Sequence, residues 1–242
     1  MCQLKSCLVL KDRVFCPDYN SHQQMLEELG IEDDYLHASK TFVRVEFTPP
    51  DVVQSLIEPL DRWTLEVDQD IVPEWWDEKA DRQRVEEAVE IWHKGHVFTE
   101  GKHIVTTGTV YAYGNAEVHV YNDATVEAYD STIVKAYSNA KVYAFDKTTV
   151  ETVSNVPVEA CGDATVKAYG NTKVEAFDRA IVKACGSATV TAYDNATVKA
   201  YDSATVKAWN NAMVKACDSA IVVYPRKKKI VYPAGWTAET HN

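Results

Sequence analysis

The sequence predicts a mainly β protein, in which a two-sheeted β-solenoid with about 16 residues per coil follows a small N-terminal α+β domain. Two observations support this fold class. Valine recurs at every eighth position from 110 to 222, within the frame A-T-V-x-A-aromatic-turn-turn. The acidic residues lie mostly before this repeat: residues 1–100 contain 22 Asp and Glu against 10 Lys and Arg, and the rest of the chain is almost neutral.

The eight-residue period distinguishes a strand from a helix. A helix turns by about 100° per residue, so valines eight residues apart would drift by about 80° per repeat and spiral around its surface. A strand alternates its side chains with a period of two, so every valine returns to the same face. The Asp-Ser and Gly-Asn dipeptides after the aromatic position fit a tight turn. Each octad is therefore predicted to form one strand and one corner.

Two octads are predicted to make one coil. The inward rows would be Ala, Val and Ala, which are small enough for two sheets to close on them, whereas a triangular coil would enclose an unfilled centre. The residue after each valine also alternates between two series. One series is mixed or acidic, and the other is mostly lysine, at Lys135, Lys167, Lys183, Lys199 and Lys215. This alternation predicts a solenoid with two unequal faces and about seven coils.

The first hundred residues predict the elements of the α+β domain in order. Residues 7–17 alternate as a β-hairpin with its turn near Lys11. Ser21 is followed three residues later by Gln24, which is the capping box of a helix start, and Gly30 then ends this short helix.

Two further strands and a longer helix complete this domain. Residues 41–47 and 63–69 alternate as strands. Pro73 is predicted to open a helix that Gly95 ends. Its apolar stripe follows helical spacing at Val85, Ala88, Val89 and Trp92. The domain is expected to cap the first coil and so to protect an open sheet edge.

These elements divide the chain into an acidic head at 1–100, a solenoid at 101–224 and a C-terminal cap or tail at 225–242. The octad at 150–157 breaks the alanine, aromatic and turn rules together, and Pro157 removes a donor from the strand ladder. We expect a local irregularity of the solenoid there.

The aromatic position of the octad predicts ladders of stacked rings at the two edges of the solenoid. One ladder would contain Tyr113, Tyr129, Phe145, Phe177, Tyr193 and Trp209. The other would contain Tyr121, Tyr137, Tyr169 and Tyr201, which are also candidates for partner binding.

The lysine series has two interpretations. Lysines stacked about 4.8 Å apart present a row of positive charge that can meet a polyanion. Like charges on one face also keep a solenoid soluble and unpaired, and we favour this interpretation over direct nucleic-acid binding. The five lysines stay candidates for binding a protein partner, and a homodimer through a solenoid face is a related expectation.

Carboxylates crowd the turn before the long helix of the head. The candidate partner-binding residues here are Asp68, Asp70, Glu74, Trp75, Trp76 and Asp77, with Trp63 close by in sequence. Paired carboxylates can perform acid–base chemistry, but no nucleophile, phosphate loop or oxyanion motif accompanies them, so no catalytic residue is assigned. A solvated acidic turn at a helix N-terminus explains much of the pattern. An acidic patch flanked by tryptophans also suits docking on a basic, nucleic-acid-handling surface.

The sequence predicts no metal site and no cofactor. His93 and His96 are spaced for one helix face, but Gly95 interrupts the predicted helix between them, and a zinc site needs further ligands. The cysteines near the N-terminus form no C-x-x-C pair. Three others stand where sister repeats carry aromatic rings and are interpreted as apolar substitutes: Cys161, Cys185 and Cys217.

The motif VDQDIVPEW at Val67–Trp75, followed by SATV-x-A-Y octads over 110–224, resembles a group of gut-bacterial and phage-associated repeat proteins with an acidic N-terminal module. The matching residues cover about half of the chain, and the octads are specific for the solenoid architecture. The resemblance implies a β-solenoid and a mobile-element origin. It brings no catalytic motif.

These patterns favour a non-catalytic interaction protein with a protein partner. Given the resemblance and the acidic head, the sharpest hypothesis is an inhibitor that binds a bacterial nucleic-acid-targeting defence enzyme. One alternative is a structural or adhesive rod that binds glycans or copies of itself. Another is an enzyme that acts through carboxylates of the head, such as Asp68 and Asp70.

The apolar runs of the sequence bear on location. No run approaches the roughly 18 apolar residues that a membrane-spanning helix needs, and the first residues lack a small-residue cleavage site. We therefore expect no membrane association and a cytoplasmic location, which is the host cytoplasm if the protein is phage-encoded.

Overall fold

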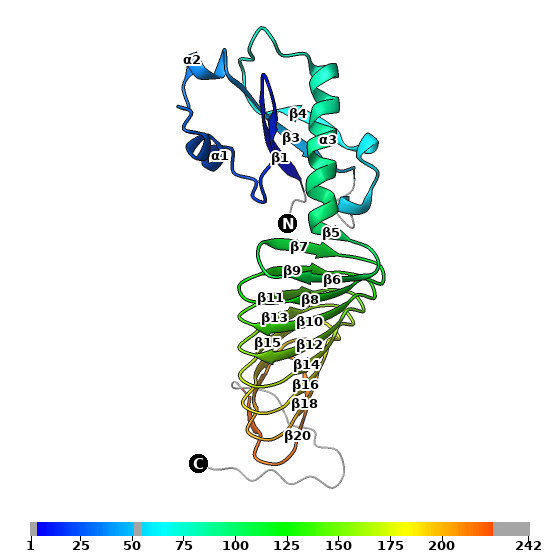
Figure 1. Ribbon diagram of the computed structural model, residues 1–242. Coiled ribbons are helices and arrows are strands. Elements are labelled where there is room, and N and C mark those ends of the chain that lie inside the picture. Colours follow the sequence, from blue (N-terminus) through cyan, green and yellow to red (C-terminus); the bar gives the residue numbers. More distant parts are fainter. Residues whose placement is uncertain (1–3, 51–54, 225–242) are drawn as a thin grey trace.

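The computed structural model describes residues 4–50 and 55–224. A head built on a four-stranded antiparallel sheet stands at one end of a stack of parallel coils (Figure 1). The strand order in the head sheet is β2-β1-β3-β4, with the bounds Lys5–Leu10 for β1, Val14–Phe15 for β2, Phe42–Thr48 for β3 and Thr64–Val67 for β4. The predicted hairpin and both predicted strands of the head are therefore confirmed.

Helices cover the head sheet. In the described residues they are α1 (His22–Leu29), α2 (Tyr35–Ala38) and α3 (Glu78–His96), with the 3-10 turns η1 (Ser55–Ile57) and η2 (Leu60–Arg62). The hydroxyl of Ser21 accepts the backbone N–H of Gln24 at 3.2 Å, and Gly30 takes a left-handed φ of 65°. Both predicted ends of α1 are confirmed. The short helix α2 was not predicted.

The bounds predicted for the long helix were wrong at both ends. The carboxylate of Asp77 accepts the N–H groups of Lys79 and Ala80 at 3.0 Å, so α3 begins at Glu78 and not near Pro73. Gly95 lies inside the helix, because a helical glycine costs only about 1 kcal/mol. The helix ends where Val97 becomes extended and joins the first solenoid strand.

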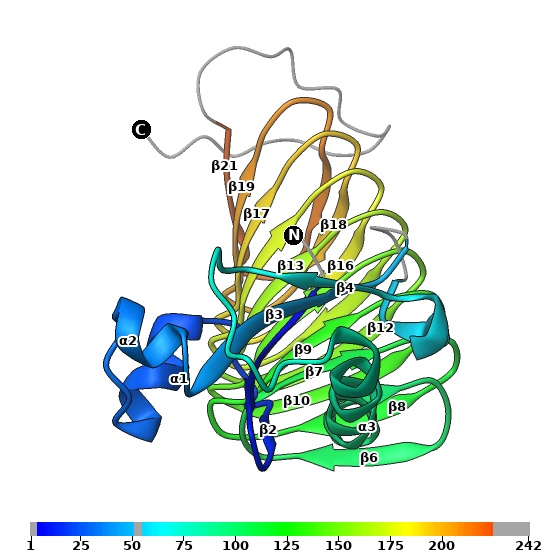
Figure 2. The ribbon, with the colours of Figure 1, turned by 90° about the horizontal axis from the view of Figure 1, so that it is seen from above.

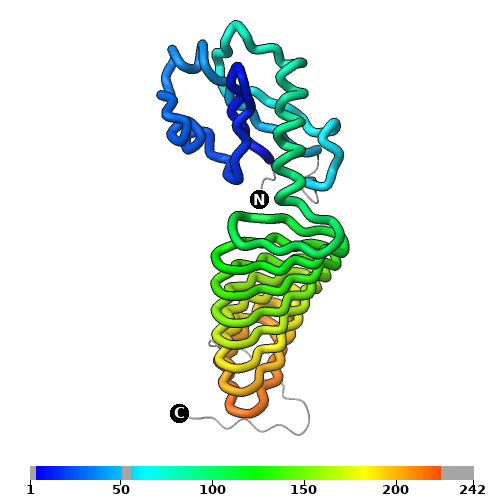
Figure 3. The backbone as a smooth tube through the Cα atoms, viewed as in Figure 1, coloured from blue at the N-terminus to red at the C-terminus, as the bar shows by residue number. Residues whose placement is uncertain are grey.

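The solenoid consists of two parallel sheets that face each other. The even sheet contains β6 (Lys102–Val105), β8 (Glu117–Val120), β10 (Ile133–Ser138), β12 (Thr149–Ser154), β14 (Thr165–Ala168), β16 (Ile181–Ala184), β18 (Thr197–Ala200) and β20 (Met213–Ala216). The odd sheet contains β5 (Val97–Phe98), β7 (Thr109–Ala112), β9 (Thr125–Ala128), β11 (Lys141–Ala144), β13 (Pro157–Ala160), β15 (Lys173–Ala176), β17 (Thr189–Ala192), β19 (Thr205–Ala208) and β21 (Ile221–Val223). Figure 3 shows the coils stacked below the head.

The pairing register confirms a coil of 16 residues. Val118 pairs with Val134, which in turn pairs with Val150, and this spacing continues through the even sheet. The stack contains about eight coils and not the seven predicted, because β5 and β6 already pair with the first regular strands. These two strands lack the A-T-V frame, so the octad rule does not detect them.

The core of the solenoid is thin and almost uniform. The Ala, Val and Ala rows point inward and are buried along the stack, as predicted, while the residues between them face outward. Every regular corner has one residue with a left-handed φ, which is Gly, Asp, Asn or Ser. At several corners this residue is an Asp whose carboxylate accepts a backbone N–H from the preceding coil, as Asp178 does from Gly162 at 3.0 Å. The corners are thus bonded to one another along the stack.

The irregular octad at 150–157 keeps the coil closed. Val156 is buried in the place of an alanine, and Pro157 is the first residue of β13, where the missing N–H removes little from the ladder. Thr152 is also buried, and its hydroxyl lies 2.9 Å from that of Thr172. The predicted irregularity therefore changes the side chains of the core and the corner but leaves the strand pairing intact.

The head is joined to the first coil by the C-terminal part of α3. Figure 2, seen from above, shows α3 nearly end-on over the strands of the first coils. The ring of Trp92 lies 6.3 Å from that of Tyr111, and the fully buried Tyr113 belongs to the same apolar cluster as the core of the head. The head thus covers the first coil, as predicted. The cap or tail predicted at 225–242 lies outside the described residues.

Candidate interaction surfaces

The acidic candidates of the head lie on the connection between β4 and α3. This connection is at the end of the head farthest from the solenoid (Figure 1). Asp68, Asp70 and Glu74 are exposed, and Asp68 lies 3.2 Å from Nδ1 of His22. Asp77 is exposed too, but its carboxylate caps α3. The connection therefore presents a group of solvated carboxylates together with the N-terminus of a helix.

The tryptophans beside these carboxylates are packing residues. Trp75 and Trp76 are half-buried against the head core, and Nε1–H of Trp75 donates to the carbonyl of Lys40 at 2.8 Å. Trp63, expected to flank the acidic patch, is only 1% exposed, and its Nε1–H donates to the carbonyl of Glu58. It lies in the core because a strand that alternates from Trp63 turns this ring toward α3. The two half-buried rings hold the acidic connection in place.

A second acidic group was missed by the sequence interpretation. The connection from α1 to α2 has Glu32, Asp33 and Asp34 exposed, and the next two residues, Tyr35 and Leu36, are 73% and 54% exposed. Asp34 caps α2, and the backbone and side-chain hydrogen bonds from His37 lower the pKa of its carboxyl. The signal in the sequence is the run EDDYL, where apolar residues directly follow three acids. Figure 1 shows α2 at the outer side of the head.

The histidines considered for a metal do not converge. His93 bonds to the carbonyl of Leu56, and Nδ1 of His96 lies 2.7 Å from the carbonyl of Trp92. The next two histidines of the chain, His103 and His119, lie on the solenoid and form hydrogen bonds to Glu100 and Glu117 of their own coils. Elsewhere in the described residues, donor atoms of Glu32, Asp34 and His37 lie within 4.8 Å of one another, but the site is open to solvent and Nδ1 of His37 already bonds to Asp34. Nothing here defines a metal centre.

The lysine series lies on the outer face of the even sheet, but its members differ. Nζ of Lys135 lies 2.9 Å from the carboxylate of Glu117, and Glu151 stands between Lys135 and Lys167 in the register. Beyond that point lysines follow one another on successive strands, at Lys167, Lys183, Lys199 and Lys215. Only the part of the face toward β20 is therefore a continuous basic row.

The stability that Glu117 contributes should be lost in acid. Side-chain hydrogen bonds from His119 and Lys135 lower its pKa from 4.5 to about 2. Because the folded state favours the carboxylate, this contribution is complete above the unfolded pKa of 4.5 and is lost as the pH falls toward 2. We expect Glu117→Gln to lower the free energy of unfolding in urea at neutral pH and to change it much less at about pH 2. An equal loss at both values would contradict this pairing, and the exposed Glu151→Gln is the control.

The aromatic rows form short stacks and not continuous ladders. Tyr113, Tyr129 and Phe145 stack with centroids 4.9 Å apart, and Phe177, Tyr193 and Trp209 form a second stack below. Cys161 occupies the position between the two stacks. The predicted second ladder was wrong beyond Tyr121 and Tyr137, which stack at 4.7 Å. A ladder needs a ring on every coil, whereas Val153 and Cys185 separate Tyr169 and Tyr201 from the next rings.

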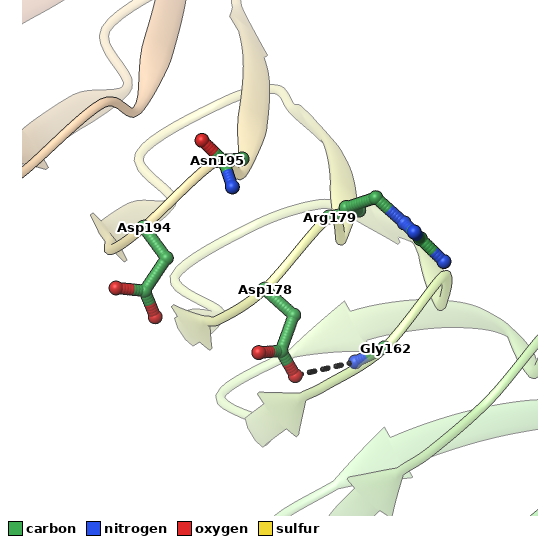
Figure 4. Close-up of a pocket in the computed structure, with 5 residues that line it drawn as sticks. All are labelled: Gly162, Asp178, Arg179, Asp194 and Asn195. Atoms are coloured by element: carbon green, nitrogen blue, oxygen red, sulfur yellow. Dashed lines mark hydrogen bonds between the residues drawn. The ribbon is translucent and has the colours of Figure 1, made fainter.

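A shallow hollow at one edge of the solenoid has a structural origin (Figure 4). It is lined by Gly162, Asp178, Arg179, Asp194 and Asn195. Asp178 is bonded to the backbone of Gly162, and the guanidinium of Arg179 forms two bonds of 2.7 and 2.8 Å to the carboxylate of Asp163. The polar side chains that line the hollow form hydrogen bonds to corner residues of neighbouring coils.

Comparison with protein-family models, with curated proteins and with solved structures found no match. Among the helices in the described parts of the chain, none is long and apolar enough to cross a membrane.

Proposed function

We propose that this is a non-catalytic protein-binding protein whose acidic head docks on the basic, nucleic-acid-binding surface of a bacterial defence enzyme and inhibits it. The solenoid serves as a rigid support for the head. The observation that supports this proposal most directly is the concentration of charge. Residues 1–100 carry 22 acidic against 10 basic side chains, whereas the solenoid is almost neutral.

The arrangement of the head supports docking in two ways. Solvated carboxylates on the connection from β4 to α3 give a field that attracts a basic partner and raises its association rate. Tyr35 and Leu36 on α2 are exposed beside three further acids and supply apolar area of the kind that anchors an interface. A surface of this composition complements the lysines and arginines with which an enzyme holds phosphates.

The partner is tested by capture followed by an activity assay. The protein is immobilised, incubated with bacterial lysate, and the retained proteins are identified by mass spectrometry. We expect a nucleic-acid-processing enzyme whose cleavage or binding of nucleic acid is inhibited by the pure protein. Recovery of no such enzyme, or of one that keeps full activity, would contradict the proposal. Binding to a glycan array or to further copies of the chain would instead support an adhesive rod.

The acidic connection is tested by charge reversal. We expect Asp68→Lys, Asp70→Lys and Glu74→Lys together to weaken binding to the captured enzyme by about a hundredfold, because like charges facing each other cost several kcal/mol. Affinity is measured by surface plasmon resonance at constant salt.

The matched control reverses three carboxylates on the solenoid, Glu151, Glu159 and Glu175, and thus changes the net charge equally. The proposal requires this control to keep its affinity. An equal loss in both variants would show that net charge, and not the head surface, determines binding.

A further inference from the structure

Two cysteines face each other on the hairpin of β1 and β2. The N–H of Leu10 donates to the carbonyl of Arg13 at 2.8 Å, which makes these residues a hydrogen-bonded pair at the turn. The register continues through Val9 with Val14 and Leu8 with Phe15. Continued by one residue beyond the end of β2, the same register places Cys7 opposite Cys16. Because hydrogen-bonded and non-hydrogen-bonded pairs alternate, this pair is of the close type, with Cα atoms about 4.5 Å apart.

That geometry suits a disulfide, whose Cα atoms are usually about 4.4–6.8 Å apart. The two thiols are in contact, and the hydrogen bond between them raises the pKa of Cys7 well above its ordinary value and lowers the pKa of Cys16. Cys7 is fully buried, whereas Cys16 is half-buried. Cys16 is thus the thiol that a reagent from solution reaches, and Cys7 is its neighbour inside the core.

A buried ammonium group lies beside this pair. Lys5 is fully buried, and its ammonium group lies 4.9 Å from the centre of the Trp92 ring. The acceptors that the described residues offer to Nζ are uncharged: the carbonyl oxygens of Pro17 and Tyr19 and the side-chain oxygen of Asn20. Burial lowers the pKa of Lys5, and the nearby thiols and Asp18 raise it. Within the described residues the hydrogen bonds of this cation go only to neutral groups, and a thiolate at Cys16 would add negative charge beside it, in addition to the more general field of Asp18.

We propose that Cys7 and Cys16, opposed on the hairpin beside Lys5, form a redox-active dithiol that exchanges with low-molecular-weight disulfides such as glutathione disulfide. The Cys16 thiolate attacks one sulfur of glutathione disulfide, forms a mixed disulfide and releases one glutathione thiolate. Cys7 then gives up its proton, attacks the Cys16 sulfur and releases the second glutathione thiolate. Two electrons pass from the protein to the reagent, and the two thiol protons end on the two glutathione molecules.

The other described cysteines cannot form such a pair within the chain. Cys185 and Cys217 lie on one edge of the solenoid two coils apart, which separates them by about 9.6 Å. Cys161 follows a strand of the odd sheet and lies at the opposite edge. These distances exceed the roughly 7 Å beyond which a bridge requires backbone movement.

The proposal is tested on the wild-type chain with glutathione disulfide as the probe. We expect the intact mass to fall by about 2 Da, which is the loss of two hydrogens, and two of the six thiols to become unreactive after denaturation. Tryptic digestion without reductant should join the peptide at 6–11 to the peptide at 14–40. A stable glutathione adduct without closure, or a link from either peptide to the one at 1–5 that contains Cys2, would overturn the proposal.

Two variants separate the roles. The triple variant Cys161→Ser, Cys185→Ser and Cys217→Ser should oxidise at the wild-type rate, and a slower rate would place the reactive thiols on the solenoid. Lys5→Met, which keeps the length and apolar stem of the side chain, should slow the first exchange step about tenfold, provided that its circular dichroism matches the wild type. An unchanged rate in a folded Lys5→Met variant would refute activation by Lys5.

Discussion

Replacing Val182 by Asp is expected to unfold the solenoid around β16. The valine is completely buried, and its register neighbours in the even sheet are Val166 and Val198, which are buried as well. An ionised carboxylate at this position would have only alanines and valines around it. Leaving a buried charge without a partner costs about 3–5 kcal/mol or more, which is a large part of the stability of most domains. Urea denaturation followed by circular dichroism at 218 nm measures the loss of sheet directly.

The control is the next residue of the same strand. Lys183 faces outward and is exposed. The substitution Lys183→Asp therefore places an aspartate next to position 182 but leaves the core unchanged. We expect this variant to differ from the wild type by no more than about 0.5 kcal/mol. Similar losses of unfolding free energy in both variants would mean that β16 is buried on both faces, which would contradict an inward row of valines.

A second large effect is expected at the junction of head and solenoid. Gly114 has a φ of +60°, and a Cβ atom built on it would lie 2.7 Å from the carbonyl oxygen of Thr99. Left-handed backbone alone is tolerated at these corners, because Asp130 and Asp146 adopt it on the next two coils. The close contact distinguishes this glycine, since the backbone at Thr99 must move to admit a methyl group. We expect Gly114→Ala to cost about 3 kcal/mol or more.

Gly186→Ala is the matched comparison. Gly186 has a similar φ of +69°, but its nearest atom, the backbone nitrogen of Gly170, lies 3.3 Å from the position of the added Cβ. The left-handed conformation alone costs an alanine about 1 kcal/mol. Both variants adopt the left-handed conformation, but only Gly114→Ala also brings a methyl group against a carbonyl oxygen. The difference between their thermal unfolding midpoints therefore measures the effect of that close contact. Equal shifts of the midpoint would show that the carbonyl of Thr99 does not define this corner.

The solenoid could be predicted from the sequence because one local rule repeats there. Each octad contains its own strand, its own inward alanines and its own left-handed corner. The fold can therefore be predicted without knowledge of contacts between residues that are distant in the sequence. Prediction failed where the sequence does not contain the repeat motif. The first two strands lack the A-T-V frame, and the end of α3 is decided by Val97 joining a sheet and not by Gly95.

The surfaces of the head were harder to predict, because they depend on long-range packing. The acidic run after β4 is evident in the sequence, but the burial of Trp63 depends on α3 and β3 closing over it. The opposition of Cys7 and Cys16 follows from the predicted hairpin. The burial of Lys5 instead requires the residues at 17–20 and Trp92, which contact it in the fold but are distant from it in the sequence. Charge and turn residues are local signals, but solvent exposure is not.

Because all regular coils share one register, the length of the solenoid can change in steps of one coil. Every regular coil meets the next through the same backbone bonds and the same corner, so an insertion or loss of 16 residues rejoins equivalent positions. An insertion of eight would exchange the lysine-bearing and mixed faces for everything that follows. Duplication or deletion of whole coils during evolution can therefore lengthen or shorten the molecule by about 4.8 Å at a time, with no change in the sequence of the head.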